Sequence, residues 1–236
     1  MYPMKKKPVM RPLITPMTPM ILPLDEIDYV LLDLDGTLLD KYFDDYFWEH
    51  LVPKKYAELH KITFGSAKKE LLRRYKGQAG TLNWYDLDFW SRELNLDIPA
   101  LKEQIRHLIE MHPHVEEFLS SLRERGKKVH LVTNAHYKAI EIKFKKTEIG
   151  KYFDHVVSSF SLEAPKEALL FWEKAEKLLG FKRERTLFID DTEAILRTAR
   201  EYGIKYLVYK TKANSRARCK RVRDFPCVTD FRELIE

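Results

Sequence analysis

The chain has 236 residues, enough for one substantial hydrophobic core and a smaller inserted unit. Its hydrophobic content of 44%, with 4 Trp, 12 Tyr and 13 Phe, indicates a packed globular protein and excludes a disordered chain. Its 2 cysteines are too few for a disulfide framework, so we expect a reducing compartment, the cytoplasm.

The first 24 residues predict a flexible extension. Three lysines at 5–7 precede an apolar stretch and together resemble a signal peptide, but prolines interrupt the stretch and no small-residue cleavage site follows it. No other stretch approaches the roughly 20 apolar residues of a membrane span, so we expect no membrane partner.

An apolar run, Tyr29–Leu32, predicts a buried strand, and the segment Asp33-Leu34-Asp35-Gly36-Thr37 follows it directly. Asp33 and Asp35 project from the same side of an extended chain, so their like charges need a cation or a shared proton. Ligands of α/β sheets bind at the carboxyl ends of strands. The pattern favours a reactive pair of acids. The alternatives are an acidic turn and a calcium loop, although a calcium loop would carry an acid or amide at its fifth position.

Residues 41–110 predict an all-helical cap domain inserted after this strand. Period-two patterns are absent there, and four amphipathic helical patterns replace them, with Gly80 and its polar neighbours in the middle. The apolar residues that define the four patterns are Phe43, Phe47 and Leu51; Ala67, Leu71 and Tyr75; Leu87, Trp90 and Leu94; and Ile98, Leu101, Ile105, Leu108 and Ile109.

Strands and helices alternate from residue 111 onward. We predict helices at 113–126, 136–147, 166–179 and 192–202, with strands around Val129, at 156–157, around Leu187 and at 206–208. Such alternation predicts a doubly wound α/β core, a parallel sheet with helices on both faces, formed by residues 25–40 and 111–236.

Polar residues follow three elements of this core. Thr133 and Asn134 end a strand, Lys166 opens a predicted helix, and Asp190 and Asp191 end another strand. Taken separately, they could be a helix cap, a solvated lysine and an acidic turn. Taken together with the first motif, they place two acid pairs, a hydroxyl and a lysine near the ends of three strands.

These four motifs resemble those of the haloacid dehalogenase-like superfamily of phosphotransferases. The dehalogenase branch of the superfamily lacks the second acid of the first motif, so the presence of Asp35 points to phosphoryl chemistry. The helical insert after the first strand is similar to the superfamily's cap over the active site. The resemblance implies a metal-dependent phosphatase that forms an aspartyl-phosphate intermediate.

The resemblance also implies a role for each catalytic residue. Asp33 would be the nucleophile. Asp35 would protonate the leaving alkoxide and then take a proton from the attacking water. Thr133 and Asn134 would bind phosphoryl oxygens, and Lys166 would hold the charges of nucleophile and phosphate together.

The cofactor implied by the resemblance is Mg²⁺, a hard cation that prefers oxygen ligands. Its ligands would be the Asp33 side chain, the backbone carbonyl of Asp35 and one acid of the next pair. Asp191 is favoured as the direct ligand, with Asp190 as its supporting partner.

Three segments, 43–48, 81–85 and 133–136, resemble the bacterial GMP/IMP nucleotidase subgroup, and the resemblance spans roughly residues 28–207. It implies a small phosphomonoester substrate, a purine nucleotide such as GMP or IMP. Tyr46 and Trp84 would offer the base a stacking face, while Asp44 or Asn83 would read its edge. The alternative is that the aromatic side chains form the core of the cap.

The net charge of +6 owes much to seven lysines and arginines in the segment 210–223, which contains no acid among them. This segment predicts a solvated surface, and nucleic acid is not expected as a partner, because no aromatic platform is interleaved with the basic residues. Two rival functions stay open. One is a phosphatase for another monoester, such as a sugar phosphate. The other is a non-catalytic protein of the same fold that binds an acidic partner.

Overall fold

The computed structural model describes residues 22–220 and 222–235. Most of the predicted N-terminal extension therefore lies outside the described residues. At its described end, Leu22 and Leu24 pack against the hydrophobic core. Within these ranges no helix has the length and apolar character needed to cross a membrane.

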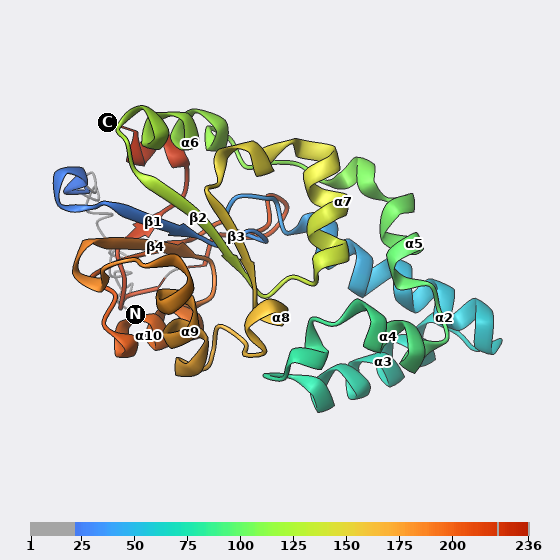
Figure 1. The fold of residues 1–236 in the computed structure, drawn as a ribbon. Helices are drawn as coiled ribbons and strands as arrows, with labels where there is room; N and C mark the ends of the chain where they lie inside the picture. The colour runs from blue at the N-terminus through green and yellow to red at the C-terminus, as the bar shows by residue number, and fades with distance from the viewer. Residues whose placement is uncertain (1–21, 221, 236) are drawn as a thin grey trace, which may run out of the picture.

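Six parallel strands form the central sheet, and these are β1 (Tyr29–Leu32), β2 (Lys128–Thr133), β3 (His155–Ser158), β4 (Thr186–Asp190), β5 (Tyr206–Lys210) and β6 (Cys227–Val228) (Figure 1). They lie in the order β3-β2-β1-β4-β5-β6. Leu32 of β1 is level with Leu131 of β2 and Ile189 of β4. The residues that follow these three strands therefore meet at one edge of the sheet.

Helices cover both faces of the sheet because successive strand residues point to opposite sides. Val30 and Leu32 pack in the cluster that contains α6 (Val115–Glu124) and α7 (Tyr137–Thr147). Leu31 packs in the cluster of α9 (Leu169–Leu179) and α10 (Glu193–Tyr202), and the short α8 (Ser159–Leu162) precedes α9. Figure 1 shows these two layers on either side of the strands. The predicted doubly wound α/β core is confirmed.

Between β1 and β2, residues 42–108 form helices and short connections that precede the core helix α6, which confirms a helical cap inserted after the first strand. Its helices lie beyond the carboxyl ends of the strands, at the right of Figure 1. The apolar residues that predicted them are buried, except for the half-buried Leu51, Tyr75 and Leu108. The cap helices are α1 (Tyr42–Tyr46), α2 (Val52–His60), α3 (Phe64–Gln78), α4 (Leu87–Leu94) and α5 (Ile98–Gln104).

A wide π-helical turn, Phe47–Leu51, joins α1 to α2 without a break in the helical path. Pro53, in the first turn of α2, has no N–H group to donate back along the helix. The wider turn is a local adjustment of the kind that accommodates a missing hydrogen bond inside a helix.

The two connections between core and cap run side by side. Leu39 pairs with Met111 in an antiparallel bridge. On either side of that bridge, the N–H of Asp40 donates to Glu110 O at 2.9 Å and the N–H of His112 donates to Leu38 O at 2.9 Å. The cap therefore leaves the core and returns to it at a single place.

The start of α9 and the strand β6 differ from prediction, and the short α8 was not predicted. The helix predicted from Lys166 begins at Leu169, because the N–H of Lys166 donates to the Asn134 side chain and its carbonyl accepts from Trp172 Nε1. These bonds keep Lys166 in the turn before the helix. The short strand β6 was not predicted, since two residues are too few to show an alternating pattern.

The prediction that the whole basic segment is solvated is wrong at Lys210. This residue is the last of β5 and only 1% exposed, and its Nζ donates to the carbonyls of Thr229 at 2.7 Å and Lys212 at 3.2 Å. Burial lowers the pKa of Lys210 to about 8. The side chains of Arg216, Arg218, Lys220 and Arg223 are exposed, as predicted.

Candidate active site

The sheet order brings the motif residues together. Asp33 follows β1, Thr133 ends β2 and Asp190 ends β4, the two neighbours of β1. The backbone turns sharply after Asp33, and Gly36 adopts a φ of +90°. A Cβ on Gly36 would lie 2.6 Å from Asp191 Oδ2, so only glycine lets the turn pass this close to the acid.

Lys166 lies at the centre of this group and is 1% exposed. Its Nζ donates to Asp33 Oδ1 at 2.5 Å, to Asp190 Oδ2 at 2.7 Å and to the Val132 carbonyl at 3.2 Å. Burial opposes the charge on Lys166, but Asp190 and Asp33 keep its pKa above the ordinary value. The ammonium therefore stays charged and joins the acids that follow β1 and β4.

Three carboxylates, those of Asp33, Asp190 and Asp191, have oxygens within 4.8 Å of one another. Burial raises the pKa of Asp33 to about 7, that of Asp190 to about 6 and that of Asp191 to about 7. Oxygen donors that crowd together in this way fit a hard divalent cation, which would offset their repulsion.

The two neighbouring acids differ in what already binds them. Asp190 Oδ2 accepts from Lys166, and Asp190 Oδ1 accepts from the N–H of Thr192 at 2.7 Å. The Asp191 carboxylate accepts from the Thr192 hydroxyl through Oδ1 at 3.4 Å. Among the described residues, none donates a hydrogen bond to Asp191 Oδ2, so this oxygen is available to a ligand.

A second group with metal-binding side chains, Asp86, Asp88 and His136, lies where the cap meets the core. Its carboxylates already have partners. Asp86 accepts the N–H groups of Asp88 and Phe89 at the start of α4, and Asp88 accepts from Lys138 at 2.6 Å. Asp86 therefore caps the N-terminus of α4, and Asp88 forms an ion pair between the cap domain and the core. These structural roles explain the group without a metal.

The side chains that follow β2 face the same space. The Thr133 hydroxyl accepts from the N–H of Ala135 at 3.0 Å. Asn134 donates to Glu167 Oε2 at 2.9 Å, and its Oδ1 accepts from the N–H of Lys166 at 3.0 Å. Asn134 thus holds the turn that carries Lys166.

A cavity of about 530 Å³ extends from the aspartates to the cap. On the side of the sheet it is lined by Asp33, Asp35, Thr133, Asn134, Lys166, Asp190 and Asp191. On the cap side its lining contains the aromatic side chains Trp48, Tyr75, Trp84, Tyr85 and Trp90, together with the charged side chains Asp44, Asp45, Glu49, Lys76 and Lys102. We call the part lined by the aspartates and Lys166 the charged end. We call the aromatic side chains of the cap the aromatic end, and further charged side chains of the cap stand among them.

The comparisons with known proteins agree with this geometry. Residues 27–203 match the family model of haloacid dehalogenase-like hydrolases. The chain is 38% identical over 210 residues to the GMP/IMP nucleotidase YrfG of Escherichia coli (strain K12), covering 89% of this chain and 95% of that protein. The chain belongs to the haloacid dehalogenase-like hydrolase family.

Two further relatives are more distant. The pyrophosphatase PpaX of Bacillus cereus is 27% identical over 171 residues, covering 70% of this chain and 75% of the relative. The crystal structure of a phosphatase of the same family from Thermococcus onnurineus aligns with a TM-score of 0.74 at 23% identity, covering 88% of this chain and 95% of that one. The family, together with the second acid Asp35, makes this haloacid dehalogenase-like hydrolase a phosphatase of phosphoric monoesters.

The structure of this hydrolase separates the four residues of the cap expected to bind substrate. Trp84 lines the cavity and is 38% exposed. Asp44 also lines it, but both of its oxygens accept from lysines. Tyr46 does not line it, and its ring contacts those of Tyr42 and His50. Asn83 is exposed outside the cavity and donates to Gln78 Oε1 at 3.2 Å.

Two buried lysines of the hydrolase were not predicted as site residues. Lys143 of α7 lies 2.6 Å from Asp35, and Lys102 of α5 lies 2.5 Å from Asp44. Burial opposes the charge on Lys143, but Asp35 and Asp44 hold its pKa above the ordinary value. A signal was present in the sequence, because Lys143 falls on the apolar face of its helix with Ala139 and Ile140.

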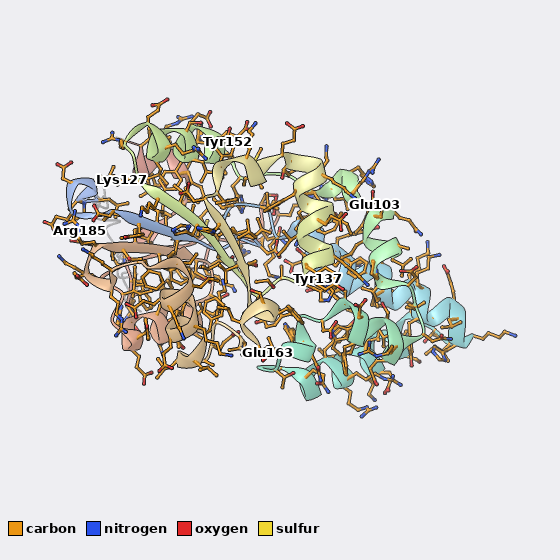
Figure 2. All side chains as sticks on the ribbon, viewed as in Figure 1. Glu103, Lys127, Tyr137, Tyr152, Glu163 and Arg185 are labelled. Atoms are coloured by element: carbon orange, nitrogen blue, oxygen red, sulfur yellow. The ribbon has the colours of Figure 1, made fainter. Side chains whose placement is uncertain are left out.

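The core and cap of this hydrolase meet through further polar contacts. The Tyr85 hydroxyl donates to Glu167 Oε1 at 2.7 Å, and Glu167 Oε2 accepts from Asn134. Figure 2 shows Tyr137 at the start of α7, on the side of the cap, and its hydroxyl donates to Asp88 Oδ2 at 3.4 Å. The cap is thereby bonded directly to the loop that precedes α9 and to the start of α7.

Proposed function

We propose that this phosphatase hydrolyses purine nucleoside 5′-monophosphates, with GMP and IMP as its preferred substrates. The observation that carries the proposal is the cavity with a charged end and an aromatic end, in a chain 38% identical to a GMP/IMP nucleotidase. The charged end would take the phosphate of any monoester. The aromatic end, with Trp84, would take the flat purine ring.

In the proposed reaction, the Asp33 carboxylate attacks phosphorus, and the bond from phosphorus to the nucleoside 5′-oxygen breaks. Asp35 gives its proton to the departing oxygen. Asp35 then takes a proton from water, which attacks the aspartyl-phosphate and releases inorganic phosphate. Thr133 and Asn134 would bind phosphoryl oxygens, while Lys166 holds the charge of the nucleophile.

We also propose Mg²⁺ as the cofactor, held by the side chains of Asp33 and Asp191 and by the backbone carbonyl of Asp35. Asp190 would not bind the metal directly, since both of its oxygens already accept hydrogen bonds within the protein. It would instead hold Lys166 and the turn after β4 in place. Bound there, Mg²⁺ would supply positive charge to the phosphoryl oxygens and to the crowded carboxylates.

Removal of divalent metal should abolish activity reversibly. We expect excess EDTA to reduce GMP hydrolysis by about 10²-fold or more, because the three carboxylates would then repel the phosphate. Added Mg²⁺ should restore the rate, and circular dichroism before and after chelation should show the same folded protein. Full activity in excess EDTA would contradict the proposed cofactor.

Substrate preference should follow the base. We expect kcat/KM for GMP and IMP to exceed that for AMP and pyrimidine nucleotides by about 10-fold or more. The 38% identity to a GMP/IMP nucleotidase supports this preference, and a purine offers Trp84 a larger stacking face than a pyrimidine does. The measurement is a panel of phosphomonoesters assayed with the purified protein. If a sugar phosphate is hydrolysed more efficiently than both purine nucleotides, the nucleotidase proposal fails and the phosphatase assignment stands.

Trp84→Ala should narrow the gap between purine and pyrimidine nucleotides more than it slows hydrolysis of p-nitrophenyl phosphate. Asn83→Ala is the matched control, because this neighbouring side chain lies outside the cavity. Equal effects of the two substitutions on the purine preference would remove Trp84 from base recognition.

The effect of removing the proposed acid on kcat/KM should depend on the leaving group of the substrate. Asp35→Asn should lower kcat/KM for GMP by about 10²-fold or more, because the 5′-alkoxide needs a proton to depart. The loss for p-nitrophenyl phosphate should be much smaller, since nitrophenolate is a stable anion. The parameter kcat/KM is the right one to compare, because it reports the steps up to leaving-group departure and excludes hydrolysis of the intermediate. Equal losses for both substrates would remove Asp35 from the acid role.

A further inference from the structure

The proposed acid, Asp35, is the first of four side chains of alternating charge that lead from the core into the cap. Lys143 Nζ donates to Asp35 Oδ1 at 2.6 Å and to Asp44 Oδ2 at 2.7 Å. Lys102 Nζ donates to the other oxygen of Asp44, Oδ1, at 2.5 Å. We call Asp35, Lys143, Asp44 and Lys102 the charge chain.

The members of the charge chain come from both parts of the molecule. Asp35 lies in the loop after β1 and Lys143 in the core helix α7, whereas Asp44 and Lys102 belong to the cap helices α1 and α5. The two lysines are each 1% exposed, and Lys102 Nζ also lies 4.4 Å from the centre of the Phe47 ring. Because their ammonium groups are shielded from water, these ion pairs hold a more defined geometry than exposed pairs do.

We propose that Lys143 is a positioning residue that orients the Asp35 carboxylate for proton transfer, and that Asp44 keeps Lys143 in place from the cap. The inference rests on the acid role proposed for Asp35. Within the described part of the chain, Lys143 Nζ donates only to Asp35 and Asp44. Its ammonium fixes Oδ1 of Asp35 and thereby leaves the other oxygen to face the leaving group.

The same contacts argue against a different role for Asp44. A carboxylate that reads the edge of a purine must keep an oxygen free for the base. Both oxygens of Asp44 accept from buried ammonium groups, which would lose their partners if the carboxylate turned toward a ligand. Asp44 therefore acts on the reaction through Lys143.

The decisive measurement is the ratio of kcat/KM for GMP to that for p-nitrophenyl phosphate. Lys143→Met removes the ammonium with little change in side-chain length. It should lower kcat/KM for GMP by about 10²-fold and that for p-nitrophenyl phosphate much less, because misplacing the acid harms only the substrate that needs its proton. Lys143→Arg, which keeps a charged donor, should recover part of the ratio.

The matched control is Lys138→Met. Lys138 lies on the same helix α7 and also joins core to cap, through its 2.6 Å contact with Asp88, but it does not contact Asp35. If the charge chain merely fastened the cap, both substitutions would slow both substrates alike. The ratio should change in Lys143→Met and stay at the native value in Lys138→Met.

Asp44→Asn is a second test of whether Lys143 positions Asp35, and it remains informative if Lys143→Met does not fold. It leaves the contact between Lys143 and Asp35 but weakens the hold on Lys143 from the cap, so the ratio should fall by about 10-fold. A native ratio in the folded Lys143 and Asp44 variants would overturn the inference. A native ratio in Asp35→Asn would instead overturn the proposed acid, so the two failures are distinguishable.

Discussion

Asp33→Asn is expected to lower turnover of every phosphomonoester by about 10⁴-fold or more while leaving the fold intact. The amide has nearly the shape of the carboxylate and still offers Lys166 an oxygen at the position of Oδ1, which lies 2.5 Å from Nζ. It lacks the negative charge needed to attack phosphorus. Unlike the loss expected for Asp35→Asn, this loss should be equally severe for GMP and for p-nitrophenyl phosphate.

Acid quenching of the reaction with substrate labelled in the phosphoryl group tests the same claim directly. Labelled protein should form with the native enzyme and be absent with Asp33→Asn. Asp28→Asn is the control, because Asp28 precedes the start of β1 and pairs with Arg185, at the opposite end of the strand from the proposed catalytic acids. Covalent labelling that persists in Asp33→Asn would assign the nucleophile to another residue.

Lys166→Met is expected to destabilise the protein by about 3–5 kcal/mol and to abolish activity. The substitution would leave Asp33 and Asp190 buried without the ammonium that lies 2.5 Å and 2.7 Å from them. Urea unfolding in the presence of EDTA measures this cost without a metal that could replace the lost charge.

The control for this substitution is Lys205→Met. Lys205 pairs with Glu26 at 3.0 Å, but both side chains are more than half exposed. Exposed ion pairs contribute little to stability, so the loss should be small. If the two substitutions cost the same, Lys166 does not hold the acids together in the way that its contacts indicate.

The catalytic end of the site is well specified by local sequence, and the cap end is not. Asp33, Thr133 and Asp190 each follow a short apolar run, and parallel pairing of those runs is enough to bring them to one edge. Asn83 and Trp84 are neighbours in sequence, yet only Trp84 lines the cavity. Which of these two side chains points into the cavity depends on how α3 and α4 pack, and no local sequence pattern predicts that packing.

The sequence prediction also failed for buried lysines, which it placed in water or overlooked. Lys210 was expected in water because it begins a basic run, but β6 and the carbonyls of Lys212 and Thr229 enclose it. Lys102 and Lys143 were overlooked because a lysine among apolar residues is usually solvated. Their partners, Asp35 and Asp44, are distant in sequence and are brought to them by the tertiary fold.

The pairing of Leu39 with Met111 has a consequence for how such a protein can change. Because the two connections lie side by side, the ends of the inserted segment are already joined by hydrogen bonds within the core. A longer, shorter or unrelated segment that starts and finishes at these two residues would leave every strand of the sheet in register. Grafting and recombination can therefore exchange the part proposed to meet the base while the sheet with its acids is inherited unaltered.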